Sequence, residues 1–113
     1  MTKQKSPLPT RKELLILSVL WQLGPTTVRD IHEHLKQRQQ TTTYTTTLKM
    51  MQVMLDKGLL IKNSEPVAHI YTPRLSQETT QIQLTRDLID RGFYGRPEDL
   101  QQLLEKIIKT DKR

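Results

Sequence analysis

The chain has 113 residues, of which 35% are hydrophobic and 4% aromatic, so it can form one small domain, or one domain with a small appendage, around a thin core. Because it contains no cysteine, disulfides and thiolate metal sites are excluded, and a reducing cytoplasm is the compartment that fits. The net charge of +6 lies wholly in residues 1–74, which carry eleven Lys/Arg against five Asp/Glu, whereas residues 75–113 carry seven of each. The basic excess of the first part therefore favours a polyanionic partner.

The longest strongly apolar run covers residues 14–23 and is interrupted by Ser18 and Gln22. It is too short to span a bilayer. The lysines near the N-terminus are not followed by the apolar core of a signal peptide. We therefore expect a cytoplasmic protein without membrane insertion.

Residues 1–9 lack periodicity and are predicted to be a flexible basic arm. Thr10 and Glu13 then have the spacing of a capping box, in which the threonine hydroxyl accepts from the glutamate amide and the carboxylate reaches back. A helix is predicted from there to Leu23, stopped by Gly24 and Pro25. Its expected buried residues are Leu14, Leu17, Val19, Leu20 and Trp21.

Thr27 to Asp30 repeats the capping pattern and predicts a second helix with Val28, Ile31 and Leu35 on its inner face. A polar turn at residues 37–40 separates it from a third helix, predicted from about Tyr44 to Lys57 with Gly58 as its stop. The apolar residues of the third helix recur at helical spacing: Leu48, Met51, Met54 and Leu55.

Six threonines between residues 41 and 47 cluster where the third helix starts. Its outer face carries short hydroxyls, methyls and one cation, and no carboxylate before Asp56. Such a face can enter the major groove, because hydroxyls donate to phosphates or base edges and methyls lie against the thymine methyl. The alternative is a threonine-rich helix start that is merely solvated. The residues of this face are Thr42, Thr45, Thr46, Lys49 and Val53.

After Gly58 the period changes, and two short strands are predicted at residues 59–62 and 68–72, joined by a loop at 63–66. Three helices followed by a hairpin outline a winged helix-turn-helix, here assigned to residues 10–74. In this order the third helix takes the recognition position. The predicted fold is thus mainly α, with a β-hairpin wing.

Residues 75–113 are predicted to form a helical dimerisation region. Ser76 can cap a fourth helix that runs to about Arg91, residues 92–95 break it, and Pro97 starts a fifth. The fifth helix carries an apolar stripe with little to pack on in one subunit, which favours a homodimer; folding back onto the first helix is the alternative. The expected interface residues are Leu88, Phe93, Leu100, Leu103, Leu104, Ile107 and Ile108.

The stretch from Leu8 to Ile31 resembles the penicillinase-repressor family of bacterial winged-helix regulators (the BlaI/MecI type) almost position by position. The resemblance includes the opening helix, a Leu-Trp pair, a Gly-Pro-x-Thr-Val turn and the second helix. It covers residues 8–74 well and the rest more weakly. The matching segments are Leu20-Trp21, Leu23-Gly24-Pro25, Thr27-Val28, residues 44–48, residues 56–60 and residues 71–73.

This resemblance implies a dimeric repressor that binds a palindromic operator on double-stranded DNA and is released by an upstream signal. In the best-known members a membrane sensor-protease cuts the repressor in its C-terminal helices, which makes residues 92–95 a candidate cleavage site; an ordinary turn is the alternative. The copper-controlled branch carries a C-terminal cysteine pattern that this chain lacks. Three residues depart from the family's usual pattern, so the operator can differ: Thr47, Lys49 and Val53.

Thr45, Thr46 and Lys49 are the residues expected to face bases. The second group is expected to contact phosphates: Thr42, Thr43, Arg29, Lys62 and His69. The resemblance further implies Arg11 and Lys12 as phosphate contacts; the alternative for these two and for Arg29 is a solvated surface charge.

Nothing in the sequence predicts an enzyme, a cofactor or a metal site. His32 and His34 are two apart on a helix and point away from each other. No Ser-His-Asp order, glycine-rich phosphate loop or helical His-Glu-x-x-His is present. Two rival classes remain: a winged helix used as a protein-docking module, and a DNA-binding activator or architectural protein without a sensor. The operator, the regulated genes and the inducing signal are not encoded in these residues.

Overall fold

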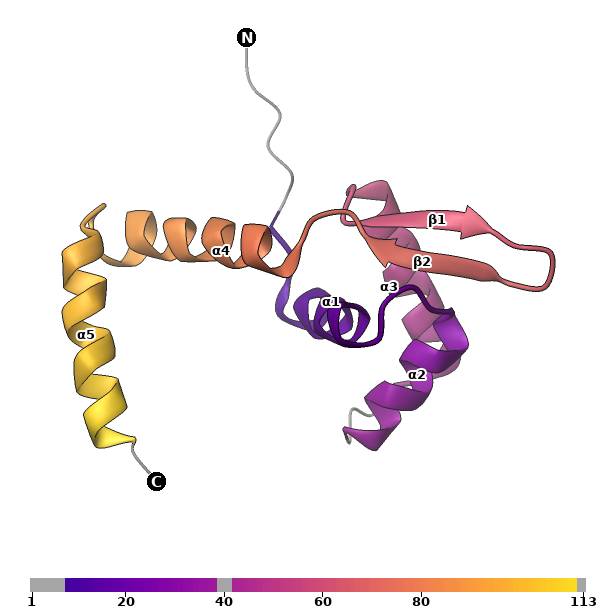
Figure 1. Cartoon of the computed structure of the whole chain (residues 1–113), viewed down its shortest axis with the longest axis horizontal. Helices are drawn as coiled ribbons and strands as arrows, with labels where there is room; N and C mark the ends of the chain where they lie inside the picture. Colours follow the sequence, from indigo (N-terminus) through magenta and orange to yellow (C-terminus); the bar gives the residue numbers. More distant parts are fainter. Residues whose placement is uncertain (1–7, 39–41, 112–113) are drawn as a thin grey trace, which may run out of the picture. The chain divides into compact units, whose positions relative to one another are not determined.

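The computed structural model describes residues 8–38 and 42–111 and contains five helices and one hairpin in that part (Figure 1). The chain divides into two compact units, residues 1–77 and 78–113, and each is considered by itself. Most of the arm predicted at residues 1–9 lies outside the described residues; Leu8 and Pro9 are half-buried.

Helix α1 runs Arg11–Leu23, and both hydrogen bonds of the predicted capping box are present. The Glu13 amide donates to Thr10 Oγ1 at 3.2 Å, and the Thr10 amide donates to Glu13 Oε1 at 2.9 Å. The helix ends at Gly24, whose φ of 85° lies in the region that favours glycine. The predicted start and stop of the first helix are therefore confirmed.

Helix α2 runs Val28–Gln37 and helix α3 runs Tyr44–Asp56, and each has a threonine N-cap: Thr27, which was predicted, and Thr43, which was expected only as a phosphate contact. The Asp30 amide donates to Thr27 Oγ1 at 3.2 Å. The Thr46 amide donates to Thr43 Oγ1 at 3.1 Å. Such caps satisfy amides that have no partner inside a helix, and this local effect explains why the helix starts could be read from the sequence.

Strands β1 (Leu60–Ser64) and β2 (His69–Pro73) form the predicted antiparallel hairpin, each beginning one residue later than expected. The hairpin extends past the helices of the first unit (Figure 1). Thr26, between α1 and α2, pairs with Tyr71 through two backbone hydrogen bonds of 3.2 and 2.8 Å. Three helices followed by this hairpin make a winged helix, and the two further helices make a C-terminal helical tail, so the predicted fold class is confirmed.

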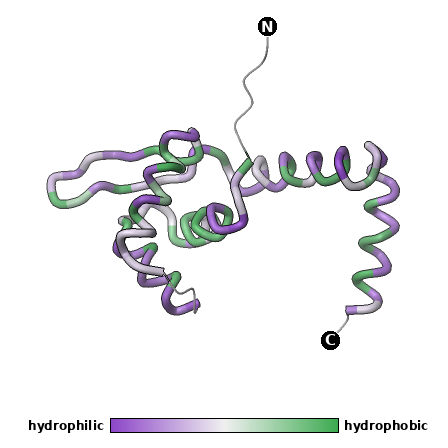
Figure 2. Tube along the Cα trace, turned by 180° about the vertical axis from the view of Figure 1, so that it is seen from behind, coloured by the Kyte–Doolittle hydropathy of each residue, from purple (hydrophilic) through white to green (hydrophobic). Residues whose placement is uncertain are grey.

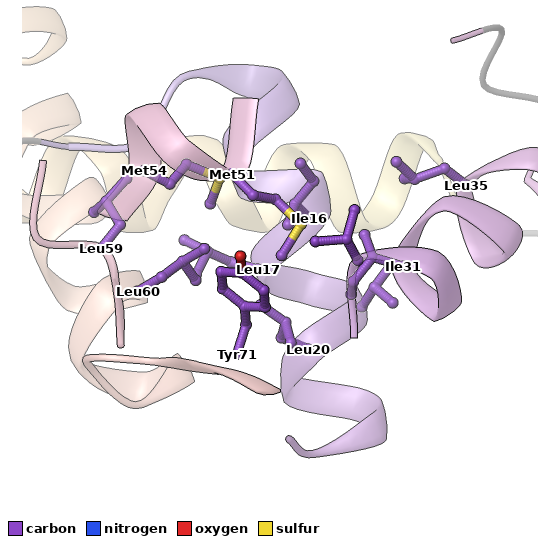
Figure 3. Packing of buried hydrophobic residues seen from close by; sticks show 12 residues of the cluster. Ile16, Leu17, Leu20, Ile31, Leu35, Met51, Met54, Leu59, Leu60 and Tyr71 are labelled. Atoms are coloured by element: carbon purple, nitrogen blue, oxygen red, sulfur yellow. The ribbon is translucent and has the colours of Figure 1, made fainter. Parts of the chain in front are cut away.

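The core of the first unit forms where α1 packs against α2, α3 and β2. The Tyr71 ring lies near Leu60, Leu17 and Leu20 (Figure 3). The structure corrects the expected burial of α1: Ile16, which was not predicted, is buried. The whole buried set of this helix is Glu13, Ile16, Leu17, Val19 and Leu20.

Leu14 and Trp21 were expected in the core but are only half-buried. The buried positions 13, 16, 17 and 20 form a stripe along α1 that Leu14 and Trp21 flank. The Trp21 indole N–H donates to the backbone oxygen of Leu75 at 3.1 Å, so the ring lies at the edge of the core.

Helix α3 buries Thr47, Met51 and Met54 completely, whereas Leu48 and Leu55 are half-buried. Thr47 belongs to the threonine cluster but was not among the residues predicted for the buried face; it lies four residues before Met51 and shares its face. Its hydroxyl donates to the backbone oxygen of Thr43 at 3.2 Å, which provides a hydrogen-bond partner inside the core.

The second unit contains α4 (Gln77–Gly92) and α5 (Pro97–Thr110), close to the predicted bounds. The turn between them has positive φ at Tyr94 (55°) and Gly95 (77°), and the Gly95 amide donates to the Ile89 oxygen at 2.9 Å. Hydrophobic residues recur along α5 (Figure 2), yet none of its residues is buried. In the described part of the chain, no helix has the length and apolar character needed to cross a bilayer.

Candidate nucleic-acid interface

One face of α3 is exposed and carries hydroxyls and a cation. Thr45, Thr46 and Lys49 are exposed, and Val53 is 49% exposed one turn further on. No acidic residue lies in the first turn, so no carboxylate offsets the partial positive charge of the helix start. The predicted exposure of these four residues is confirmed, and the face suits a polyanion.

The threonines at the start of α3 have different environments. The Thr43 hydroxyl donates to Thr46 Oγ1 at 3.0 Å while it accepts from the Thr46 amide, so Thr43 is engaged as a cap. Because Thr46 Oγ1 accepts from Thr43, its own hydrogen points away from Thr43, and the residue is exposed.

Thr42 was expected on the exposed face of α3, and the structure corrects this. It precedes the N-cap and is half-buried, and its hydroxyl oxygen is enclosed without a hydrogen-bond partner among the described residues. The periodicity of a helix does not extend to a residue that precedes it, so the pattern placed Thr42 incorrectly.

Arg29 and His69 lie at the edge of the same hollow, which has a volume of about 300 Å³ and is formed by the start of α2, α3 and the wing. The Arg29 guanidinium carbon lies 5.7 Å from the centroid of the Tyr44 ring, a distance suited to a cation–π contact. The hollow is lined by Thr27, Val28, Arg29, Tyr44, Leu48, Ala68, His69 and Tyr71. Two predicted phosphate contacts from distant parts of the sequence thus line one hollow beside α3.

The strand register determines which face of the wing carries its basic residues. Lys62 pairs with Tyr71, and Ser64 pairs with His69. Because side chains alternate along a strand, Lys62 and His69 share the face of Tyr71, which packs on the helices. Both basic residues are exposed.

Arg11 and Lys12 are also exposed, but they lie at the other end of α3. The neighbouring Glu13 is bound by Lys57, the C-cap of α3, with Nζ 2.7 Å from Oε1. A helix of 13 residues is about 20 Å long. The structure therefore separates Arg11 and Lys12 from Thr45 and Thr46.

Glu13 holds its negative charge although its side chain is only 6% exposed. Burial by itself would raise its pKa. The hydrogen bonds from Lys57 and Thr10, together with the charge of Lys57, outweigh that effect and hold the pKa of Glu13 below its usual value of 4.5.

Two residues beside the face were not predicted to take part in it. Tyr44, 41% exposed in the first turn of α3, contacts Arg29 and lies 5.8 Å from His32, ring centroid to ring centroid, with the rings nearly perpendicular. A single aromatic residue within a run of threonines was the available signal for Tyr44. His32 was weighed only as a metal ligand, and nothing in the sequence shows that its ring meets α3.

The second unit exposes the residues that were predicted to form an interface. Leu88 is 49% exposed, and Phe93 and Leu100 are half-buried. The fifth-helix stripe is largely open to solvent: Leu103 (41%), Leu104 (47%), Ile107 (43%) and Ile108 (67%). A contiguous apolar stripe of this kind is typical of a contact surface.

His34 Nδ1 lies 3.1 Å from the Asp30 backbone oxygen, whereas His32 Nδ1 faces Thr47, so the two imidazoles have separate partners. Within residues 8–38 and 42–111, no three His, Asp or Glu side chains gather closely enough to hold a metal ion.

Comparison with protein families gave a match that spans most of the chain. The chain matches the penicillinase repressor family over residues 9–112, which covers both compact units. No curated protein was found to be similar to it.

Proposed function

Because the chain belongs to the penicillinase repressor family, whose members are DNA-binding transcriptional repressors, we propose that it holds a palindromic operator as a homodimer and so represses transcription. Family membership supports a regulator and not an enzyme. The observation that carries the proposal is the exposed face of α3, where Thr45, Thr46 and Lys49 stand at a helix start without acidic residues.

In this proposal α3 enters the major groove. Lys49 donates to a guanine edge or a neighbouring phosphate, and the hydroxyls of Thr45 and Thr46 donate to base edges. Val53 lies one turn further along the same face and can contact a thymine methyl.

Phosphate contacts surround this face. Arg29 and His69 meet at the hollow beside α3, and Lys62 lies on the same face of the wing as His69. Arg11 and Lys12, at the far end of α3, would reach the backbone at a flank of the site. Phosphate contacts of this kind position the protein and carry most of its salt dependence.

The second part of the proposal is the homodimer, which rests on the exposed stripe of α5. Leu103, Leu104 and Ile107 would lie in its centre, shielded from water by the second copy. Two recognition helices tethered in this way read half-sites about one helical turn, or a multiple of it, apart. Occupying a promoter then blocks the polymerase.

Release is proposed to follow cleavage between α4 and α5. Tyr94 is 87% exposed in that turn, so its side chain is open to a protease. Loss of α5 removes the stripe while leaving α3 intact, so the affinity gained from bivalency is lost although no DNA contact changes. A membrane sensor-protease is the partner that such a signal requires.

The rival docking module predicts an apolar patch on α3. Among the described residues of that helix, Tyr44 and Val53 are the large exposed apolar side chains, and Lys49 lies between them in sequence. This arrangement favours DNA. An activator would make the same DNA contacts, and a reporter gene behind the bound sequence separates it from a repressor by the sign of the response.

The test is a salt titration with two duplexes, one selected by the wild-type protein from a random pool and one with the same bases scrambled. If each subunit neutralises about four phosphates, log K falls against log salt with a slope near −0.9 per contact. Lys49→Ala should weaken binding to the selected duplex more than to the scrambled one. Lys109→Ala, on α5, is the matched control. Affinity that does not change with salt would overturn the proposed function.

A further inference from the structure

Two residues one turn apart on α2 meet two residues one turn apart on α3. Arg29 lies over the Tyr44 ring at 5.7 Å, and the His32 ring stands almost perpendicular to that ring, at an interplanar angle of 85°. His32 Nδ1 is 3.4 Å from Thr47 Oγ1, a long hydrogen bond. These contacts join the two helices at the first turn of α3.

The hydrogen-bond directions at Thr47 follow from its surroundings. Thr47 is fully buried, and its O–H donates to the Thr43 backbone oxygen at 3.2 Å. While the hydroxyl donates to Thr43, its oxygen can accept from His32, and this pairing requires a hydrogen on Nδ1. The contact thus selects the Nδ1–H form of the His32 imidazole.

Thr45 and Thr46 lie between Tyr44 and Thr47 in the sequence and point to solvent while their neighbours are held by α2. A helix with its side chains is about 10–12 Å across, so a rotation of about 10° about its axis moves a side-chain tip by roughly 1 Å. Hydrogen bonds to base edges require distances within a few tenths of an ångström. Small rotations of α3 therefore change which bases these hydroxyls can reach.

We propose that His32 is a positioning residue that, through Thr47 and Tyr44, sets the orientation of α3 and thereby the DNA sequence preference of this protein. The inference rests on the proposed function, because it assigns a specificity determinant to the same DNA-reading face. His32 itself touches no DNA in this account.

Removing the Thr47 hydroxyl should leave the fold intact. The Thr43 oxygen still accepts from the Thr47 amide at 3.0 Å, and the half-buried His32 can hydrogen-bond to water through either ring nitrogen, so water does not fix its tautomer. Valine keeps the branched shape of threonine. A change in sequence preference without a change in melting temperature would therefore report orientation and not stability.

The experiment compares Thr47→Val with Thr47→Ser, using the selected and scrambled duplexes. Thr47→Val should lower the ratio of the two affinities about 5- to 10-fold, mainly by weakening the selected duplex. Thr47→Ser keeps the hydroxyl and should preserve the ratio, although its lost methyl lowers the melting temperature. Thr80→Val makes the same substitution at a buried threonine of α4, outside the proposed site, and controls for the effect of replacing a buried threonine by valine.

His32 is tested directly with a second pair. His32→Phe keeps a ring beside Tyr44 but cannot bond Thr47, and it should reduce the ratio as Thr47→Val does. His34→Phe makes the same change at a histidine whose Nδ1 lies against the Asp30 backbone oxygen of its own helix, and it should leave the ratio unchanged. The double variant of His32 and Thr47 should be no worse than either single variant, because both remove one contact.

An NMR measurement on the free protein separates this inference from the proposed function. Imidazole nitrogen shifts should show the Nδ1–H form of His32 in the wild type and its loss in Thr47→Val. An unchanged imidazole, or equal affinity ratios for wild type and Thr47→Val, would overturn the inference while leaving the repressor in place. A wild type that prefers no duplex would overturn the proposed function, and the NMR result would then decide the contact alone.

Discussion

The ion pair between Glu13 and Lys57 links the start of α1 to the end of α3, and its removal is expected to weaken the whole winged helix. Glu13 Oε1 accepts from Lys57 Nζ at 2.7 Å and from the Thr10 amide at 2.9 Å. Glu13→Gln removes the charge but keeps a side chain that can complete a capping box. The substitution therefore isolates the ion pair.

The magnitude follows from the exposure of the two partners. A hydrogen bond to a charged group contributes about 1.5–3 kcal/mol, and breaking a fully buried pair costs about 3–5 kcal/mol. The Lys57 side chain is 26% exposed and regains water when its partner is neutral. We expect Glu13→Gln to lower the free energy of unfolding by about 1–2 kcal/mol, or the melting temperature by roughly 4–15 °C. Lys57→Met should cost more, because it leaves a carboxylate that is only 6% exposed without its cation.

The same pair predicts a pH dependence. The pKa of Glu13 is lower in the folded than in the unfolded protein, so the unfolded state binds the proton more readily. The stabilisation is therefore present above the usual pKa of 4.5 and is lost as the pH falls through the lower, folded value. As the pH falls, the stability of the wild type should therefore decrease toward that of Glu13→Gln.

Thermal unfolding followed by circular dichroism, in a series of buffers from neutral to acid, measures both effects. The expected pattern is a gap between wild type and Glu13→Gln that narrows with falling pH. If the two proteins unfold at the same temperature at neutral pH, the ion pair contributes no net stability. If the gap stays constant in acid, the lowered pKa of Glu13 is refuted.

Three further predictions concern the dimer, its release and the core. Leu104→Asp should yield monomers with weakened operator binding but an unchanged single-subunit fold, because Leu104 is 47% exposed in the isolated chain. Analytical ultracentrifugation measures the oligomeric state, and a wild type that is already monomeric at tens of micromolar would reject the proposed interface. A chain ending at Phe93 should lose both dimerisation and tight operator binding in the same assays, and if it behaves like the full chain, cleavage at this turn cannot be the release step. Met51→Ala should lower the free energy of unfolding, measured by urea titration, by about 2–5 kcal/mol. Met50→Ala, at a half-buried position, should lower it clearly less, and equal decreases for the two variants would contradict the burial pattern of α3.

Local sequence determined where the elements begin and end. Thr10, Thr27 and Thr43 each cap a helix through a hydrogen bond to an amide three residues ahead, and Gly24 ends α1 in a conformation that favours glycine. These interactions span at most four residues, so a sequence pattern contains both partners. The hairpin and the amphipathic stripe of α5 follow from short periods in the same way.

The exposed part of the candidate site was equally accessible to sequence reasoning. Thr45, Thr46 and Lys49 lie opposite Met51 and Met54 on one helix, so the periodicity that predicts the buried face also predicts the exposed one. What these side chains bind remains a proposal.

Only the tertiary structure decided which residues from distant segments meet. Whether Ile16 or Leu14 enters the core depends on how α1 crosses its neighbours, and Thr47 is buried because α3 turns that side toward α2. The contact of Arg29 with Tyr44, and of Glu13 with Lys57 across 44 residues of chain, depends on the angles between helices. Those angles result from the packing of the whole core, and no short stretch of sequence contains that information.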